Sequence, residues 1–210
     1  SLGQLDGVVF TGSGVNLGVD VKESAPLRTV MEHIFKTDLP VWGSCNGMQL
    51  AAIVLGGAVR ASANGLEVGV AKGIRKTEAD KSDFALHGRA DIFAVPGVHH
   101  DEVECPPLGA VHLAENDPSS IQSFAYCADG IDFLGDQYHS ECTTNTIEKS
   151  LRRGACIFSA APTLINDLEV GESDIEAAKR LGITCDALES EERTRELANW
   201  LIHVKDRILS

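Results

Sequence analysis

The sequence predicts an α/β protein built on an open, mainly parallel sheet flanked by helices, with a β-rich middle section and C-terminal helices. In the first third of the chain, short apolar runs alternate with segments of helical periodicity, which is typical of strand–helix units. In the middle, short β-like runs follow one another across Gly, Pro, Asp and Asn residues, which indicates hairpins. The last part of the chain returns to helical periodicity.

Two strand–helix pairs are expected in the first third. Residues 6–10 form an apolar strand that ends in the glycine-containing loop 11–14. Apolar residues then recur at helical spacing over residues 27–35, after a serine and a proline that are typical of a helix start. Residues 39–42 form the second strand, and the helix expected over residues 48–55 ends at a glycine pair.

The β-like runs of the middle section cover residues 59–61, 67–71, 92–95, 110–113, 121–126 and 131–138. Near the end of the chain, residues 173–176 form a capping box, and an apolar stripe predicts a helix around Trp200. We therefore divide the chain into residues 1–142, which hold the expected sheet, and a helical extension over residues 143–210 that packs on the same domain.

Composition limits the possible partners. The 210 residues are enough for one domain, or for one domain with an appendage. A net charge of −13 argues against a nucleic-acid or anionic-membrane surface, and the basic group Lys72, Arg75 and Lys76 is more simply a solvated strand end. No apolar run reaches the length of a membrane span. We therefore expect a cytoplasmic protein that binds neither nucleic acid nor membrane.

Cys45 differs in its surroundings from the other cysteines. The six cysteines include no C-x-x-C pair, so they predict neither a zinc site nor a disulfide framework. Cys45 lies in residues 43–47 (Gly-Ser-Cys-Asn-Gly), directly between an expected strand and an expected helix. Such a turn holds a nucleophile in a strained backbone conformation, and the helix N-terminus favours the thiolate. For this motif alone, a buried structural cysteine is the simpler interpretation.

Partners for Cys45 occur in residues 137–141. Residues two apart on a strand face the same side, so His139 and Glu141 can project towards one site. A cysteine nucleophile needs a histidine to take its proton, and the histidine needs a carboxylate to fix its tautomer. Alone, the segment reads as an exposed strand end. Together with the turn around Cys45, it predicts a catalytic triad of Cys45, His139 and Glu141.

The loop after the first strand is a candidate oxyanion hole. The backbone N–H groups of Gly12 and Ser13 could stabilise an oxyanion, with the amide of Asn46 at the helix start as a second donor. A dinucleotide-binding loop is the competing interpretation. It is weak, because Leu17 stands where the third glycine should fall and no helix opens directly after the loop.

These segments resemble the motifs of class I glutamine amidotransferases. Residues 43–49 resemble their G-x-C-x-G-x-Q motif, residues 137–141 their Q-F-H-P-E motif, and residues 6–13 their glycine-containing oxyanion segment. Residues 99–103 resemble a turn found in the branch related to the glutaminase domain of GMP synthetase. The resemblance covers roughly residues 5–142, with the motifs in the family's order.

The resemblance implies a flavodoxin-like sheet, with residues 1–142 as the catalytic domain, and hydrolysis of the glutamine side-chain amide through a cysteinyl thioester. It implies that Gln49 helps to position the glutamine, that no cofactor is needed, and that a separate synthetase or acceptor-binding subunit uses the ammonia. A γ-glutamyl peptide or amine hydrolase with the same triad is the alternative enzyme. A catalytically idle domain that binds a partner or a glutamyl ligand is the alternative outside catalysis.

Four features depart from the family pattern. Ser44 replaces a β-branched residue, Asn46 replaces a bulky apolar residue, and Ser140 replaces a proline, which leaves the turn around it less rigid. Relatives also carry about one βαβ unit before the first strand of this chain. Without a neighbour, the strand at residues 6–10 would leave a row of unpaired backbone groups. We therefore expect a replacement: a preceding segment, which we favour, a strand from a partner chain, or a rearranged smaller sheet.

The remaining histidines have simpler interpretations. His99 is expected to hold the turn at residues 98–103 in place. His100 lies beside Asp101 and Glu102, but no fourth spaced ligand accompanies them, so we expect no metal site there. No role is expected for His33, His87, His112 and His203.

Overall fold

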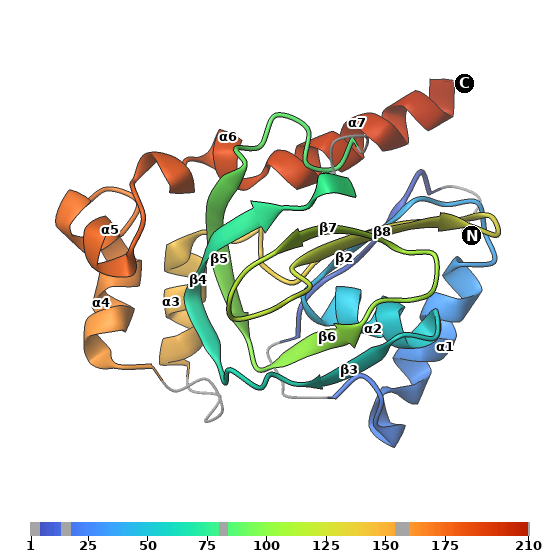
Figure 1. Cartoon of the computed structure of the whole chain (residues 1–210), viewed down its shortest axis with the longest axis horizontal. Coiled ribbons are helices and arrows are strands. Elements are labelled where there is room, and N and C mark those ends of the chain that lie inside the picture. The colour runs from blue at the N-terminus through green and yellow to red at the C-terminus, as the bar shows by residue number, and fades with distance from the viewer. Residues whose placement is uncertain (1–4, 14–17, 80–83, 154–159, 210) are drawn as a thin grey trace.

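The computed structural model describes residues 5–13, 18–79, 84–153 and 160–209. The strands are β1 (Val8–Phe10), β2 (Val41–Ser44), β3 (Ala58–Ala61), β4 (Glu67–Lys76), β5 (Ile92–His99), β6 (Asp101–Cys105), β7 (Val111–Glu115), β8 (Ser123–Ala128) and β9 (Ile131–Asp136). The helices are α1 (Ala25–Ile34), α2 (Asn46–Val54), α3 (Thr144–Arg152), α4 (Pro162–Val170), α5 (Ile175–Leu181), α6 (Ser190–Arg193) and α7 (Arg195–Leu209). Figure 1 shows the whole chain with most of these elements labelled.

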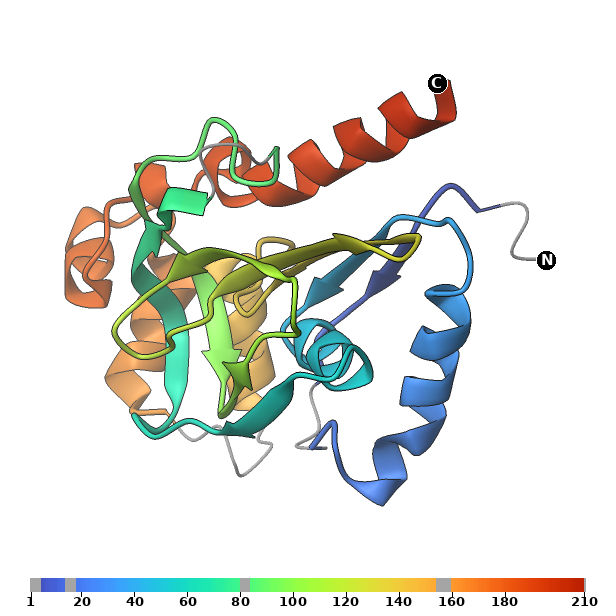
Figure 2. The ribbon, with the colours of Figure 1, turned by 45° about the vertical axis from the view of Figure 1, so that its right-hand side comes forward.

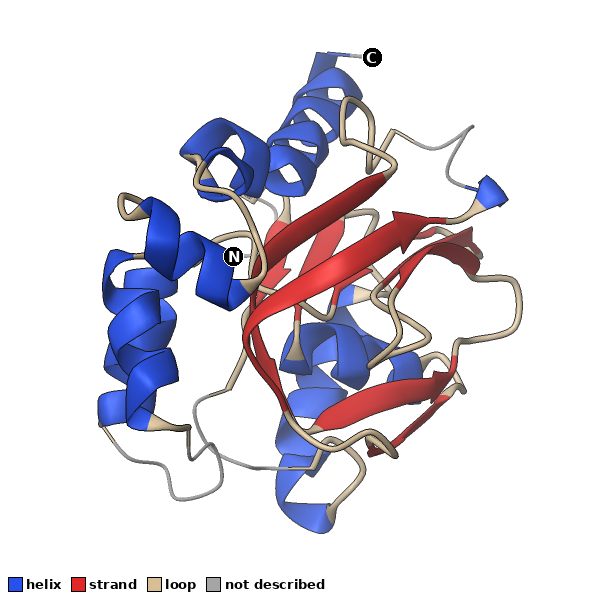
Figure 3. Ribbon diagram, turned by 60° about the vertical axis from the view of Figure 1, so that its left-hand side comes forward, coloured by secondary structure: helices blue, strands red, loops and turns tan. Residues whose placement is uncertain are grey.

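The main sheet has seven strands in the order β1-β2-β9-β8-β7-β4-β5, and β3 pairs with β6 in a separate two-stranded sheet. Strand β2 is parallel to both β1 and β9, whereas all other pairs in these sheets are antiparallel. Figure 3 shows the strands as a curled layer with helices around it. The expected α/β fold class is confirmed. The sheet is mixed rather than mainly parallel, because parallel pairing among the described strands is confined to β1, β2 and β9.

The expected second neighbour of the first strand is absent from the described part of the chain. Strand β1 pairs only with β2, so it forms the sheet edge, and Val9 on it is 44% exposed. The prediction of a further strand from another segment or a partner chain therefore stays a prediction, since the described residues contain no such strand. The strand is only three residues long, which keeps the number of unpaired backbone groups at this edge small.

Helices cover both faces of the parallel part of the sheet. On one face, Trp42 and Leu134 belong to the same buried cluster as Trp200 and Val204 of α7. On the opposite face, α1 and α2 bury apolar side chains against β2, β8 and β9, among them Met31, Met48, Val41, Phe124 and Phe133. Figure 2 shows α7 above the sheet and α1 and α2 below it. Since all four residues of β2 are buried, the strand that precedes Cys45 is enclosed on both sides.

The first part of the expected helical extension, residues 143–172, for which the sequence indicated no role, holds α3 and α4. Together with α5 these helices form a third buried cluster against β4 and β5, built from Val70, Ala94, Ile147, Leu151, Leu168 and Leu181. Thr143 caps the N-terminus of α3, and its side chain accepts a hydrogen bond from the backbone N–H of Thr146. No helix in the described ranges is long and apolar enough to cross a membrane.

A buried polar cluster joins α7 to the sheet. Arg89 forms an ion pair with Glu196, with 2.7 Å between Nη2 and Oε2, and both side chains are almost fully buried. The Tyr138 hydroxyl donates to Glu196 Oε1 at 3.0 Å. Asp136 accepts from Trp42 Nε1 at 3.0 Å and from the hydroxyl of Ser123 at 2.7 Å.

This cluster contains two buried carboxylates, and only Glu196 is paired with Arg89. Burial, together with the charge of Glu196, raises the pKa of Asp136 to about 7, although the hydrogen bonds from Ser123, Trp42 and Tyr138 oppose the rise. The folded protein therefore holds a proton on Asp136 over a pH range in which the unfolded chain, with an ordinary aspartate pKa, has lost it. The folding contribution of this carboxyl becomes less favourable as pH rises through that range and levels off above about pH 7.

We therefore predict that the stability advantage of Asp136→Asn over the wild type grows with pH. One retained proton changes the free energy of unfolding by about 1.4 kcal/mol per pH unit, so the difference should change by about 2 kcal/mol between about pH 5.5 and about pH 7. Urea denaturation at several pH values measures it. Asp91→Asn, at a fully exposed carboxylate, is the matched control. Parallel pH profiles for the wild type and Asp136→Asn would contradict the prediction.

Candidate active site

Cys45 lies at the junction between β2 and α2. Its backbone has φ 49° and ψ −104°, a conformation that residues other than glycine rarely adopt. The backbone N–H of Cys45 donates to the carbonyl of Asp136 at 2.7 Å, and its carbonyl accepts from the N–H of Gln49 at 3.0 Å. Hydrogen bonds to a neighbouring strand and to the helix therefore hold the strained turn on both sides.

The glycines on either side of Cys45 are required by close backbone contacts. A Cβ atom on Gly47 would collide with the carbonyl of Phe10 at the end of β1. A Cβ atom on Gly43 would lie 2.8 Å from the backbone carbon of Gly47. Both positions therefore exclude a side chain in this backbone arrangement.

His139 and Glu141 are in direct contact. His139 Nδ1 donates to Glu141 Oε1 at 2.8 Å. The hydroxyl of Ser44 donates to the same carboxylate oxygen at 2.8 Å and lies 3.2 Å from Nδ1. Ser44 therefore supplies Glu141 with a second hydrogen bond, a contact that no sequence motif had indicated.

The turn that carries these residues is fixed from two sides. The N–H of His139 donates to the carbonyl of Pro96 on β5 at 2.8 Å, and the N–H of Cys142 donates to the carbonyl of His139 at 3.1 Å. Arg193 of α6 donates from Nη1 to the carbonyl of Ser140 at 2.8 Å. This arginine restrains the turn at the position where the family resemblance led us to expect a proline.

Electrostatics favours a charged His139. Burial lowers the pKa of its imidazole, but the charge of Cys45 and hydrogen bonds with Cys142, Cys45 and Glu141 outweigh burial and raise the pKa well above 6.5. Burial raises the pKa of Glu141, but the hydrogen bond and charge of His139, together with the hydrogen bond from Ser44, lower it overall. The arrangement therefore stabilises a charged imidazole beside the carboxylate of Glu141.

The side-chain amides of Gln137 and Gln49 form a pair next to the sulfur of Cys45. Gln137 Nε2 donates to Cys45 Sγ at 3.4 Å, and Gln49 Nε2 donates to Gln137 Oε1 at 3.0 Å. Gln49 Nε2 also donates to the carbonyl of Asp101 at 2.7 Å, and its side chain is buried. The role expected for Gln49 in positioning glutamine stays a prediction. Gln137 contacts the sulfur directly, whereas the sequence identified it only as part of a motif.

The three expected oxyanion residues line one cavity. Gly12, Ser13 and Asn46 surround a space of about 330 Å³ together with Val9, Phe10, Thr11, Leu27, Gly47 and Leu50. The loop also approaches the histidine closely, because a Cβ atom on Gly12 would lie 2.5 Å from His139 Cε1. Only a residue without a side chain allows the loop backbone to pass the imidazole at this distance.

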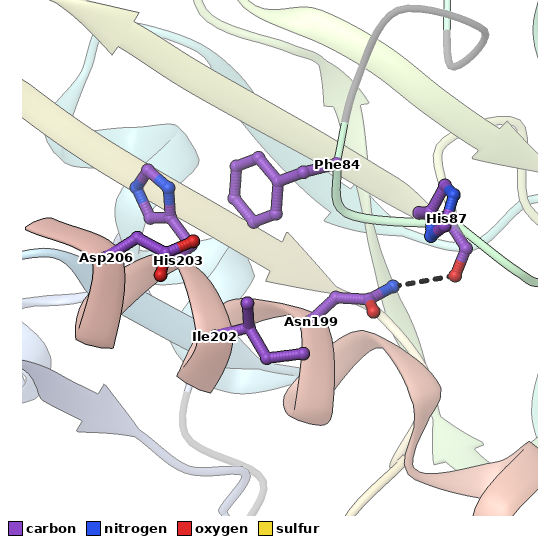
Figure 4. A pocket seen from close by; sticks show the side chains of 6 residues that line it. All are labelled: Phe84, His87, Asn199, Ile202, His203 and Asp206. Atoms are coloured by element: carbon purple, nitrogen blue, oxygen red, sulfur yellow. Dashed lines mark hydrogen bonds between the residues drawn. The ribbon is translucent and has the colours of Figure 1, made fainter.

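The other histidines lie outside this arrangement. His99 is buried, with Nε2 2.7 Å from Glu67 Oε2 and Nδ1 3.1 Å from the carbonyl of Asp101, as expected for a residue that holds a turn. His87 and His203 line a second cavity of about 280 Å³ between α7 and the segment after residue 84 (Figure 4). None of the predicted site residues lines it.

Comparison with known proteins gives the family. The family model described as glutamine amidotransferase class-I matches residues 6–157. The γ-glutamyl-L-1-hydroxyisopropylamide hydrolase of a Pseudomonas species is 34% identical over 145 residues, which cover 67% of this chain and 48% of that protein. The glutamine-hydrolysing GMP synthase subunit of Saccharolobus solfataricus is 30% identical over 159 residues, which cover 75% of each chain. The chain thus spans about half the length of the first relative and three quarters of the second.

Solved structures agree on the fold. A glutamine amidotransferase from Thermotoga maritima has a TM-score of 0.63 at 24% identity, and the match covers 93% of this chain and 77% of that one. A glutamine amidotransferase from Methylobacillus flagellatus has a TM-score of 0.63 at 21% identity, with 96% and 78% covered. Since the family model spans most of the chain, this protein belongs to the class I glutamine amidotransferases, a family of enzymes that act on amide C–N bonds.

Proposed function

We propose that this chain hydrolyses the side-chain amide of glutamine to glutamate and ammonia, with Cys45 as nucleophile, His139 as proton carrier and Glu141 as the residue that orients His139. The observation that carries the proposal is the environment of the imidazole. Nδ1 of His139 is 2.8 Å from Glu141 Oε1, and the charge of Cys45 is one of the causes that raise the pKa of the same ring despite its burial. Cys45, His139 and Glu141 thus provide a nucleophile, a base and a carboxylate that orients the base.

The chemistry follows from these positions. The thiolate of Cys45 attacks the amide carbon, and the carbonyl oxygen takes the negative charge. Backbone N–H groups of Gly12, Ser13 and Asn46 are the proposed donors to that oxygen. His139 gives its proton to the leaving ammonia as the C–N bond breaks and a thioester forms. It then takes a proton from water, which attacks the thioester and releases glutamate and the free thiol.

A second candidate substrate is a γ-glutamyl amide other than glutamine. The Pseudomonas hydrolase supports it, because that relative is named for the hydrolysis of a γ-glutamyl hydroxyisopropylamide. Both substrates present the same γ-carbonyl to the sulfur, and they differ only in the leaving amine. The GMP synthase relative supports glutamine itself, and it supports the use of the ammonia by a separate synthetase subunit.

One assay distinguishes the two candidate substrates. Purified protein is supplied with glutamine and with a series of γ-glutamyl alkylamides, and glutamate release is measured for each. A higher kcat/KM for glutamine supports the amidotransferase function, and a higher value for an alkylamide supports the hydrolase. Release of glutamate from none of them, with or without soluble cell extract, would favour an idle binding domain.

We predict that the imidazole of His139 keeps its proton at pH values where an ordinary histidine, with a pKa of about 6.5, has lost it. Burial lowers the pKa of this ring, but the charge of Cys45 and hydrogen bonds with Cys142, Cys45 and Glu141 raise it well above the ordinary value. NMR chemical shifts of the ring protons, followed as a function of pH, measure this pKa. Removal of the sulfur in Cys45→Ala should lower it. A His139 pKa at or below the ordinary value in the wild type would contradict the charged ring.

Cys45→Ala should lower the rate of amide hydrolysis by at least about 10³-fold, because the remaining groups cannot form the thioester. The small side chain fits the turn, so the unfolding transition should stay cooperative. Cys185→Ala is the matched control, since Cys185 is a half-buried free thiol whose sulfur contacts the carbonyl of Gly171. Substantial turnover in Cys45→Ala would rule out this nucleophile.

Glu141→Gln should retain more activity than His139→Ala, by a factor of about ten or more. Glu141 orients and stabilises the imidazolium, whereas His139 carries the proton itself. Steady-state kcat/KM values for the two variants give the comparison. Near-normal rates in both would show that the hydrogen bond between these residues serves only the structure of the turn.

A further inference from the structure

The turn at residues 139–142 presents three different metal-ligand types on four consecutive residues. A ring nitrogen of His139, a carboxylate oxygen of Glu141 and the sulfur of Cys142 all lie within 4.8 Å of one another. Among the described residues, no other group of three His, Cys, Asp or Glu side chains meets this spacing. The set matches neither a C-x-x-C pair nor the group around His100, so the ligand spacings considered in the sequence did not reveal it.

One atom of this set has no partner. Glu141 Oε1 accepts from His139 and Ser44, whereas Glu141 Oε2 is buried without any hydrogen bond. A buried carboxylate oxygen without a donor is unfavourable, and a cation relieves this cost. The turn is also prearranged, because the Cys142 N–H donates to the His139 carbonyl and Arg193 holds Ser140.

We propose that His139, Glu141 and Cys142 form a binding site for Zn²⁺ and that occupation of this site inhibits the enzyme. Zinc accepts nitrogen, oxygen and sulfur ligands at about 2.0–2.3 Å, which places tetrahedral ligand atoms roughly 3.3–3.8 Å apart. Side-chain rotations that move these atoms by about 1 Å bring the three ligands to that spacing. Water occupies the fourth position, as is usual where a protein supplies three ligands.

Inhibition follows from the identity of the ligands and rests on the proposed function. Zinc binds the neutral imidazole and the thiolate, so binding releases the protons of His139 and Cys142 to solvent. The group that carries the proton in hydrolysis is then occupied, and a metal on Glu141 removes its hydrogen bond with the ring. Cys142 distinguishes this site from a simple metal bridge between a catalytic cysteine and histidine. In the site proposed here, zinc binding needs the sulfur of Cys142 and does not need the sulfur of Cys45.

The test starts with binding to a protein that lacks the nucleophile. In a Cys45→Ala chain whose residues Cys105, Cys127 and Cys156 are replaced by serine, zinc affinity is measured by competition with a chromophoric chelator. We expect one zinc per chain, and at least a tenfold weaker affinity when Cys142→Ser is added, since the loss of even an outer partner costs about 10–100-fold. Cys185→Ser is the matched control and should leave the affinity unchanged.

Inhibition is then measured in chains that keep Cys45. Each variant is compared with its own metal-free rate of amide hydrolysis, so a change in basal rate does not enter the result. Zinc should inhibit the Cys185→Ser chain as it inhibits the wild type, whereas Cys142→Ser should need at least about tenfold more zinc. A chelator should restore the rate in each chain.

The outcomes separate the two proposals. Stoichiometric zinc binding that needs Cys142 in a chain without hydrolytic activity supports the metal site and refutes only the proposed function. Zinc binding that disappears with Cys45→Ala, or is equal in Cys142→Ser and Cys185→Ser, overturns the metal site. Circular dichroism and a cooperative unfolding transition identify a Cys142→Ser chain that fails to fold. In that case Cys142→Ala provides the same comparison.

Discussion

The contact between Gly47 and the carbonyl of Phe10 constrains the whole candidate site. Helix α2 can start against the end of β1 only because its second residue lacks a side chain. This approach sets the position of Asn46 beside the loop of Gly12 and Ser13, and the three line one cavity. The positive φ of Cys45 follows from the same geometry, because the chain must reverse between an enclosed strand and a helix pressed against the neighbouring strand.

The second requirement is that the turn carrying His139 keeps its position relative to the turn carrying Cys45. The backbone N–H of Cys45 bonds to the carbonyl of Asp136, three residues before His139, so β9 connects the two halves of the site. Ser44 bonds to Glu141 from the strand side. Two hydrogen bonds therefore link the end of β2 to β9 and the turn after it. One is donated by the backbone of Cys45 and the other by the side chain of Ser44.

Local features of the site could be predicted from the sequence, whereas contacts between distant segments could not. A nucleophile turn and a His-x-Glu pair each occupy a few consecutive residues, so their motifs can be read directly. The contact of Gln137 with the sulfur of Cys45 and the hydrogen bond from Ser44 to Glu141 join positions more than 90 residues apart. A short motif does not indicate which distant residue each of its members contacts. Likewise, the hairpin pattern of the middle section indicates antiparallel pairing between consecutive strands such as β8 and β9, but not the pairing of β4 with β7.

The last helices lie against both neighbours of His139. Glu196 of α7 accepts from the hydroxyl of Tyr138, and Arg193 of α6 donates to the carbonyl of Ser140. These two residues carry no catalytic signature, yet they restrain the chain on both sides of the imidazole. The C-terminal segment and the histidine turn are therefore coupled in structure. A lineage that exchanges this segment has to find another restraint for the turn, such as a proline at position 140, before the site can keep its geometry.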